Sequence, residues 1–186
     1  MKVVGNGFSQ RTAMAGWTLV EILIVLMVAS LLVTVAAPQY GDWVAKYRLA
    51  NVAQQLAASM NLARAEAIKR GARVNLCPSA DGRHCDGGAG WEGGWLVFAD
   101  INRNGEVDED EPLLRFERAA PSGVRVAANR PVDDYVSYTS LGSARMLNGA
   151  LQMGTFTLCR PGLHALKVVL ANSGRVRVES SRDACL

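Results

Sequence analysis

The stretch MAGWTLVEILIVLMVAS, residues 14–30, decides the fold of this chain. After Glu21 no charged residue occurs until Asp42, so residues 22–41 form an uncharged and mostly apolar run. Roughly 20 apolar residues are enough for a helix to span a bilayer. The run therefore predicts a membrane helix. The carboxylate at its head needs an explanation, because an ionisable group in such a segment is costly and is usually functional.

Two general interpretations of this segment leave Glu21 without a role. A secretory signal peptide would use the small residues VAA at 35–37 for cleavage, but the uncharged run is longer than a usual signal core. A plain transmembrane anchor tolerates a carboxylate near the positive end of the helix dipole. Residues 1–16 contain Lys2 and Arg11 and no acidic residue, which places them in the cytoplasm.

A third interpretation gives Glu21 a role. The segment from Gly16 to Glu21, GWTLVE, resembles the cleavage motif of type IV prepilins and type II secretion pseudopilins. The resemblance implies that residues 1–16 are a leader peptide and that a prepilin peptidase cuts after Gly16. It implies that Trp17, where the family usually has Phe, becomes the N-methylated N-terminus. It also implies that Glu21 forms an assembly ion pair with the N-terminal ammonium of a neighbouring subunit.

The following sequence predicts one long kinked helix over residues 17–70. Pro38 is expected to bend it. Beyond Pro38, apolar residues recur at spacings of three and four, which is typical of an amphipathic helix. The stripe consists of Leu49, Ala53, Leu56, Met60, Ala63 and Ala67. Gly71 provides a C-terminal stop. We expect residues 17–41 to be the transmembrane and assembly helix, and residues 42–186 to form a periplasmic globular domain.

From residue 73 onward the sequence is typical of β-structure. Short segments rich in Val, Leu, Tyr and Phe are separated by Gly, Pro, Asn and Asp. They read RVNLCP, GWLVFAD, LLRFE, GVRVAA, DYVSYTS, TFTLCR, ALKVVLA and RVRVES. A helix followed by antiparallel strands predicts an α+β fold with the sheet laid over the helix. The stretch GWLVFADINRNGEVDEDEPLLR also resembles the signature of the GspH/FimT subfamily of minor pilins and pseudopilins, which implies a type IV pilin-like fold.

The four cysteines all follow the apolar run, at Cys77, Cys85, Cys159 and Cys185. An even number on one side of a membrane segment favours disulfides in an oxidising compartment, and no C-x-x-C spacing indicates a metal site. Three connectivities exist for four cysteines. Local pairing, Cys77–Cys85 and Cys159–Cys185, is the simplest of them because short loops close most readily.

The acidic segment DINRNGEVDEDE, residues 100–111, matches the calcium-loop pattern D-x-[DN]-x-[DN]-G-x₅-E. Its ligands would be Asp100, Asn102, Asn104 and Glu111. Against calcium, a predicted strand and not a helix precedes the segment, and acidic Asn/Gly loops also form ordinary turns. The resemblance to the subfamily implies a strand-turn-strand here without a metal. Both interpretations stay open, and no other cofactor is expected.

The C-terminal stretch LANSGRVRVES predicts a hairpin with a turn at residues 172–174. Strand alternation puts Arg175 and Arg177 on one face, which in most proteins is simply a solvated face. The stretch also resembles the G-R-x-R element of FimT-like minor pilins, which implies sequence-independent binding of double-stranded DNA. The residues expected to take part are Gly174, Arg175, Arg177, Lys167 and Arg182, with Arg160 nearby.

No nucleophile–base pair, phosphate-binding glycine loop or metal triad is visible in the sequence, so an enzyme is not expected. The net charge of +3 does not by itself indicate a nucleic-acid binder. The resemblances imply a minor pilin that moves from the inner membrane into a type IV pilus, near its tip, with other minor and major pilins. There it would initiate assembly and support twitching, adhesion or DNA uptake. The alternative is a minor pseudopilin of a type II secretion system.

Overall fold

The computed structural model describes residues 17–185, apart from the side chains of residues 35–39 and of residue 89. The chain divides into two units, Met1–Asp42 and Trp43–Leu186, which are described separately below. The expected leader, with Gly16 at its end, lies outside the described residues. The side chain of Pro38, where a bend is expected, lies outside them as well.

One helix, α1 (Leu19–Arg70), occupies almost the whole of the predicted range. Thr18 caps its first turn, because Thr18 Oγ1 accepts a hydrogen bond from the backbone N–H of Glu21 at 3.2 Å. Gly71 follows its last residue with a left-handed φ of 63°, which confirms the predicted stop. Among the residues that the structure describes, no helical stretch meets both the length and the apolarity needed to cross a membrane.

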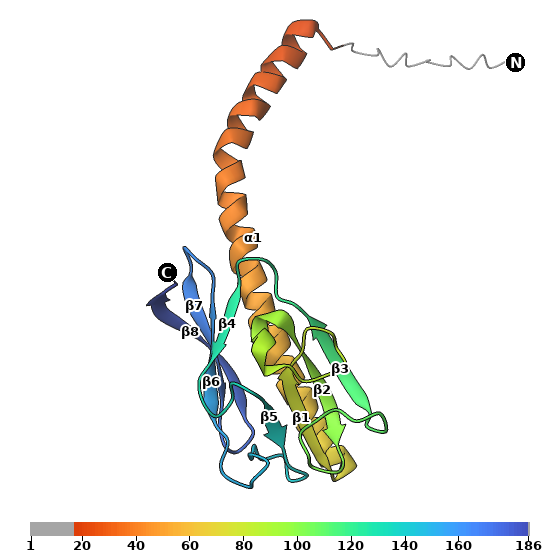
Figure 1. Ribbon diagram of the computed structural model, residues 1–186. Helices are drawn as coiled ribbons and strands as arrows, with labels where there is room; N and C mark the ends of the chain where they lie inside the picture. Colours follow the sequence, from red (N-terminus) through yellow and green to blue (C-terminus); the bar gives the residue numbers. More distant parts are fainter. Residues whose placement is uncertain (1–16, 186) are drawn as a thin grey trace, which may run out of the picture. The chain divides into compact units, whose positions relative to one another are not determined.

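The strands of the second unit form two four-stranded antiparallel sheets in the described part of the chain. The first sheet, in the order β3-β2-β1-β5, consists of β1 (Arg73–Pro78), β2 (Gly94–Asp100), β3 (Leu113–Arg118) and β5 (Val136–Tyr138). The second, in the order β4-β6-β7-β8, consists of β4 (Arg125–Ala128), β6 (Gly154–Cys159), β7 (His164–Leu170) and β8 (Val176–Ala184). Two short 3₁₀ helices precede β2, η1 (Gly87–Ala89) and η2 (Trp91–Gly93). Figure 1 shows both sheets beside the C-terminal half of α1.

The α+β prediction is confirmed, and a strand lies at each of the eight predicted segments. The expectation of one sheet over the helix is wrong, because the strands divide between two sheets. The width of the buried face of α1 explains the difference. All six residues of the predicted stripe are buried, and Val52 and Ala57 are buried beside them. A face of this width has room for contact with two sheets.

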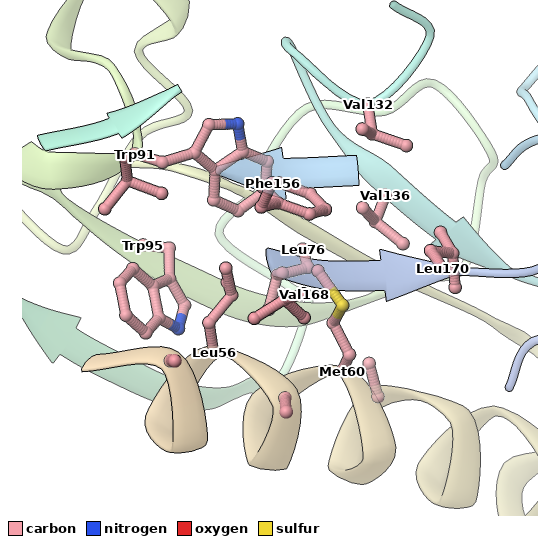
Figure 2. Packing of buried hydrophobic residues seen from close by; sticks show 14 of the residues in the cluster. Leu56, Met60, Leu76, Trp91, Trp95, Val132, Val136, Phe156, Val168 and Leu170 are labelled. Carbon is pink, nitrogen blue, oxygen red and sulfur yellow. The ribbon is translucent and has the colours of Figure 1, made fainter. Parts of the chain in front are cut away.

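The core lies between this face of α1 and the two sheets. Figure 2 shows Leu56 and Met60 of α1 close to side chains of both sheets, among them Leu76, Trp95 and Val168. All five side chains are almost completely buried. Burying an aliphatic side chain of this size stabilises a fold by about 1.5–3 kcal/mol. The core therefore holds the helix and both sheets together as one domain.

Two tryptophans link the elements around this core through both their rings and their N–H groups. Trp95 donates from Nε1 to Ser59 Oγ of α1 at 3.0 Å, in a buried hydrogen bond. Trp91 donates from Nε1 to the backbone carbonyl of Asp133 at 2.8 Å. The Trp91 ring also meets Phe156 of the second sheet edge to face, with centroids 5.0 Å apart. Large apolar rings thus lie in the core without leaving an N–H group unpaired.

Both disulfides form with the predicted local pairing. The Cys77–Cys85 bond ties the loop after β1 to that strand. The Cys159–Cys185 bond joins the end of β6 to the residue that follows β8. On the outer face of the first sheet, Cys77 belongs to a small second cluster of buried residues with Leu96 and Phe98. Loops therefore cover this face as well, and they carry much of the polar structure described below.

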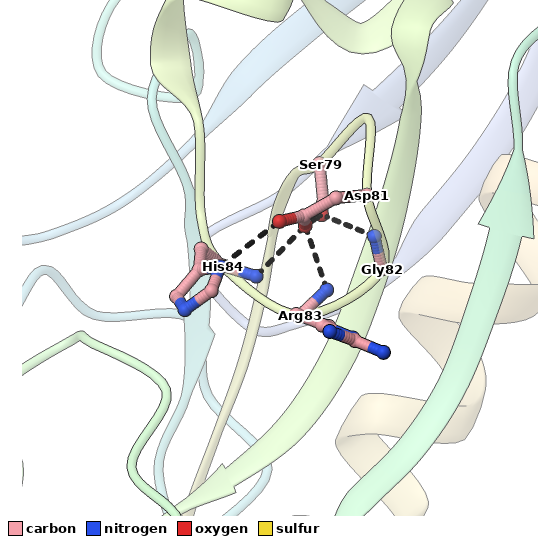
Figure 3. Close-up of polar contacts among 5 residues, drawn as sticks. All are labelled: Ser79, Asp81, Gly82, Arg83 and His84. Atoms are coloured by element: carbon pink, nitrogen blue, oxygen red, sulfur yellow. Dashed lines mark hydrogen bonds and ion pairs between the residues drawn. The ribbon is translucent and has the colours of Figure 1, made fainter.

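The carboxylate of Asp81 organises the loop that the first disulfide closes (Figure 3). Its Oδ1 accepts hydrogen bonds from the backbone N–H groups of Arg83 at 2.7 Å and His84 at 3.0 Å. Its Oδ2 lies 2.9 Å from Nδ1 of His84. Ser79 Oγ donates to Asp81 and accepts from the N–H of Gly82. The side chain of His84, followed by the two backbone donors, holds the pKa of Asp81 well below its usual range.

We predict that Asp81 makes the stability of the domain fall in acid. A lowered folded-state pKa means that its contribution is complete above the unfolded value of 3.8 and is lost as the pH falls through the folded pKa. Asp81→Asn should lower the melting temperature near neutral pH and flatten its decline between about pH 5 and pH 2. Asp110→Asn, at an exposed carboxylate, is the control and should keep the wild-type decline. An Asp81→Asn profile parallel to that of wild type would contradict the prediction.

Candidate functional sites

The segment of residues 17–34 is the first candidate site. Trp17, the expected N-methylated residue, is 71% exposed and precedes α1. The large apolar side chains that follow, from Leu19 to Val33, are also exposed. This part of α1 therefore presents apolar side chains on all sides. Glu21 is the one charged residue of this segment.

The position of Glu21 has a structural explanation as well as a functional one. Thr18 at the N-cap and Glu21 three residues later match the capping box. Thr18 makes its half of the box with the backbone of Glu21. The carboxylate of Glu21 makes no hydrogen bond or ion pair with any described residue. A role in starting the helix therefore competes with the functional explanation of Glu21.

The β7–β8 hairpin is the second candidate site. Its register pairs Lys167 with Glu179 and Val169 with Arg177. Because Val168 is buried in the core between its neighbours, Lys167 and Arg177 lie on the outer face of the second sheet. A hollow of about 530 Å³ on this face is lined by residues of all four strands, including Lys167 and Arg177.

Carboxylates neutralise most of the positive charge on this face. Arg177 forms an ion pair with Glu179. Lys167 Nζ lies 2.8 Å from Oδ2 of Asp183, and this bond, followed by one from Ser181, lowers the pKa of Asp183. Arg175, exposed in the turn before β8, makes no ion pair with a described residue. Arg175 is therefore accessible to an anionic ligand, as is Arg182 further along β8.

The basic residues expected to bind DNA do not form one patch. Arg175 lies beside the β7–β8 turn, whereas Arg182 lies near the other end of β8. Seven strand residues correspond to roughly 23 Å at about 3.3 Å per residue. Arg160 follows β6 beside the second disulfide, at the same end as Arg182. A phosphate-binding surface on this hairpin would have to be centred on Arg175 and Arg177.

The packing of the chain itself accounts for Gly174. Gly174 has a φ of 80°, in the left-handed region, and it is buried. A Cβ atom added there would collide with the backbone carbonyl oxygen of Gly142 and would lie 3.1 Å from Nε of Arg64. The hairpin turn also accepts a hydrogen bond from the N–H of Ala144 through the carbonyl of Asn172. A glycine at this position lets the turn contact the loop after β5, with or without a ligand.

The acidic segment of residues 100–111 is the third candidate site and is an ordered turn. Asn102 Oδ1 accepts the backbone N–H of Asn104, and Asn104 Oδ1 accepts that of Glu106. The Nδ2 groups of both asparagines donate to Oδ2 of Asp108 at 2.8 Å. Glu111 Oε1 accepts the backbone N–H of Ile101 at 2.7 Å. The segment thus folds back on itself between β2 and β3.

Two residues of this site were missed by sequence reasoning. Asn75 of β1 donates from Nδ2 to Oδ2 of Asp100, the first residue of the acidic segment, at 2.6 Å. Asp108 receives both asparagine amides. Asp108 occupies the ninth place of the loop pattern and was therefore detectable, whereas the contact of Asn75 depends on strand pairing. Among the described residues, no group of three or more His, Cys, Asp or Glu side chains is placed to hold a metal ion.

Comparisons with known proteins agree with this architecture. The family described as "Type II transport protein GspH" matches residues 52–180 of the chain. The pilin-like protein PilA1 of Thermus thermophilus is 29% identical over 164 residues, which cover 88% of this chain and 97% of that protein.

Two solved structures of the type IV minor pilin FimU of Pseudomonas aeruginosa are also similar. They have TM-scores of 0.58 and 0.54 and cover 77% and 73% of this chain, and 99% and 98% of those chains. Their sequence identities are 16% and 17%, so they establish the likeness of fold alone. The predicted pilin-like fold, with a long helix packed on antiparallel strands, is confirmed.

We predict that Gly174→Ala destabilises the domain more than its backbone conformation alone requires. Gly162→Ala is the matched control, because Gly162 has a similar φ of 83° and nothing within 4 Å of an added Cβ. The control should lower the free energy of unfolding by about 1 kcal/mol, the cost of a left-handed residue. Gly174→Ala should lower it by about 3 kcal/mol, because the turn must also move away from Gly142. Equal losses in denaturant unfolding would show that the close approach is unimportant.

Proposed function

Because the chain belongs to the GspH family of type II transport proteins, we propose that it is a minor pilin of a type IV pilus. A prepilin peptidase removes residues 1–16 after Gly16, and Trp17 becomes the N-methylated first residue. The mature subunit is held in the inner membrane with its C-terminal domain in the periplasm. It then enters the fibre with other minor and major pilins, where it helps to start assembly.

One observation carries this proposal: α1 begins as an exposed apolar helix with a single carboxylate near its start. Lipid and protein interiors are similarly apolar, so the hydrophobic effect gives little reason for such helices to leave the bilayer for a filament. A charge in an apolar environment changes this balance, because a paired carboxylate costs much less there than an unpaired one. Pairing of Glu21 with the Trp17 ammonium of a neighbour would therefore favour assembly and fix the register of the helices.

A minor pseudopilin of a type II secretion system is the second candidate. The description of the matching family favours it, because that description refers to type II transport. The pilin-like relative PilA1 favours the pilus. Both candidates use the same helix and the same carboxylate, so a test has to measure both outcomes in cells.

We predict that Glu21→Gln inserts into the membrane normally but enters the filament at least 100-fold less than wild type. Removing one partner of an ion pair in an apolar environment costs about 3–5 kcal/mol. Glutamine is equally suited to this place of a capping box and leaves the Thr18 cap in place, so this variant removes the charge and keeps the helix start. The measurement is the ratio of subunit in sheared filaments to subunit in inner membranes, by quantitative immunoblot.

Thr18→Ala is the matched control, because it removes the cap and keeps the carboxylate. Loss of a cap costs about 1 kcal/mol, so incorporation should fall by about fivefold at most. If Glu21→Gln assembles like wild type while Thr18→Ala fails, helix capping explains Glu21 and the proposed ion pair is wrong. Surface pili and exported enzymes are counted in the same strains. Loss of pili with normal export supports the pilus, and the reverse result identifies a pseudopilin.

Sequence-independent binding of DNA is a second proposed activity, and it rests on Arg175 and Arg177. Arg175 is exposed and lies two residues before Arg177. The guanidinium groups of such residues suit the geometry of phosphate oxygens. On binding, Arg177 would leave its ion pair with Glu179 and form one with a phosphate group. Few contacts of this kind give weak binding that decreases steeply with salt.

We predict that Arg175→Ala combined with Arg177→Ala weakens binding to a DNA duplex more than tenfold at about 50 mM salt. The control is Arg118→Ala combined with Arg182→Ala, which removes the same charge from exposed positions outside the hairpin turn. It should weaken binding less than threefold in fluorescence anisotropy with labelled DNA. Equal losses in the two double variants would mean that overall charge, and not this turn, attracts DNA. Absence of binding by the wild type at low salt would end the hypothesis.

A further inference from the structure

Asp100 is a buried carboxylate without a counter-charge. It lies at the end of β2 and is 0% exposed. No Lys, Arg or His of the described chain lies within ion-pair distance of it, and its hydrogen bond comes from the neutral amide of Asn75. A buried charge is normally paired with an opposite charge or bound to a metal, because losing its hydration is strongly unfavourable. Arg73 is paired with Asp100 in the register of β1 and β2, but its guanidinium donates to Ser137 Oγ and to the carbonyl of Arg145, so Asp100 keeps no ion pair with a described residue.

Two more oxygen atoms without hydrogen-bond partners lie close to Asp100. Asn75 Oδ1, Asp100 Oδ1 and Glu111 Oε2 are all buried and accept no hydrogen bond. Asn75 is bonded to Asp100 directly, and Glu111 is bonded to the backbone N–H of the residue after Asp100. All three orphan atoms are acceptors. Buried acceptors in native structures rarely go without a donor, and three in one place indicate an excess of negative potential.

We propose that this end of the first sheet binds one Ca²⁺ ion. The carboxylates of Asp100 and Glu111 supply the charged ligands, at the first and twelfth places of the loop pattern. The side-chain oxygens of Asn102 and Asn104 and the backbone carbonyl of Glu106 supply the neutral ones, at places three, five and seven. The ion provides the missing counter-charge and gives the orphan carboxylate oxygens a partner.

The chemistry of these donors selects calcium over other metals. The candidate ligands are all oxygen atoms, and two of the side chains are neutral amides. Ca²⁺ accepts six to eight such ligands in variable geometry, whereas Mg²⁺ requires a near-ideal octahedron and Zn²⁺ prefers nitrogen and sulfur. Asp108, which both asparagine amides now contact, occupies the ninth place of the pattern, where calcium loops often hold a bridging water.

The bound ion would fix a loop that covers part of the domain surface. Val107, in the middle of the segment, packs against the second cluster with Cys77 and Phe98. Gly105, with a φ of 81°, lies so close to Leu147 that an added Cβ would be 2.5 Å from its Cδ1 atom. Calcium would thereby hold the acidic segment against both the sheet and the loop around Leu147.

The test is calcium titration of the full-length chain in detergent, after removal of metal with EGTA. We expect calorimetry to show one ion per chain with a dissociation constant of about 10⁻⁴–10⁻³ M, the range of extracellular modules. We expect 10 mM CaCl₂ to raise the melting temperature by several degrees and equal MgCl₂ to have a much smaller effect. Asp100→Asn and Glu111→Gln should each weaken binding at least 30-fold. The matched controls Asp110→Asn and Glu109→Gln should change it less than twofold, because these exposed carboxylates occupy no ligand place.

The melting temperature in EGTA distinguishes loss of binding from loss of folding. Without calcium, Asp100→Asn should melt no lower than wild type, because it removes a buried charge that has no partner. If this variant does not fold, Glu111→Gln carries the same test. Absence of both heat and thermal shift with wild-type protein at 10 mM CaCl₂ would overturn the proposal. So would a loss of binding in the control variants as large as that in the ligand variants.

Discussion

Burial of one face of α1 is the constraint on which the rest of the structure depends. From Leu49 to Ala67 that face lies between two sheets, and the main core lies where helix and sheets meet. At its other end the same helix exposes apolar side chains all around. One continuous helix therefore carries two kinds of surface, a stripe buried in the protein interior and a stretch of exposed apolar side chains. The change of pattern from a stripe to an all-apolar surface tells them apart.

The features predicted correctly are those with local signals in the sequence. The spacing of Leu56 and Met60 predicted the buried face of α1, and Gly71 predicted its end. Short apolar segments separated by turn residues predicted the strands. The disulfides followed from short loops. The division into two sheets had no such signal, because β4 comes before β5 in the chain but joins the other sheet. Pairing between distant strands depends on contacts that no short segment encodes.

The candidate sites follow the same rule. Glu21 could be singled out because its interpretation depends on near neighbours, and the outward position of Arg177 because strands alternate, whereas Arg175 lies in the turn before β8 and not in the strand as expected. The neutralisation of Lys167 by Asp183 was not predictable, since it requires the register of β7 on β8. The same holds for Asn75 and Asp100, which meet through the pairing of β1 with β2. The sequence thus identified the charged side chains of interest, and the fold determined which of them form ion pairs or hydrogen bonds within the chain.

The charges along β8 have a consequence for copies of this domain that meet at high local concentration. β8 is the outermost strand of its sheet, and its free edge exposes backbone groups that another chain's strand could pair with. Arg177, Glu179 and Asp183 alternate along it, the register is irregular opposite His164, and a disulfide fastens the residue that follows its end. Such an edge resists sheet-to-sheet aggregation. The charged and irregular edge of β8 therefore keeps copies of this domain from joining through their sheets when they are close together.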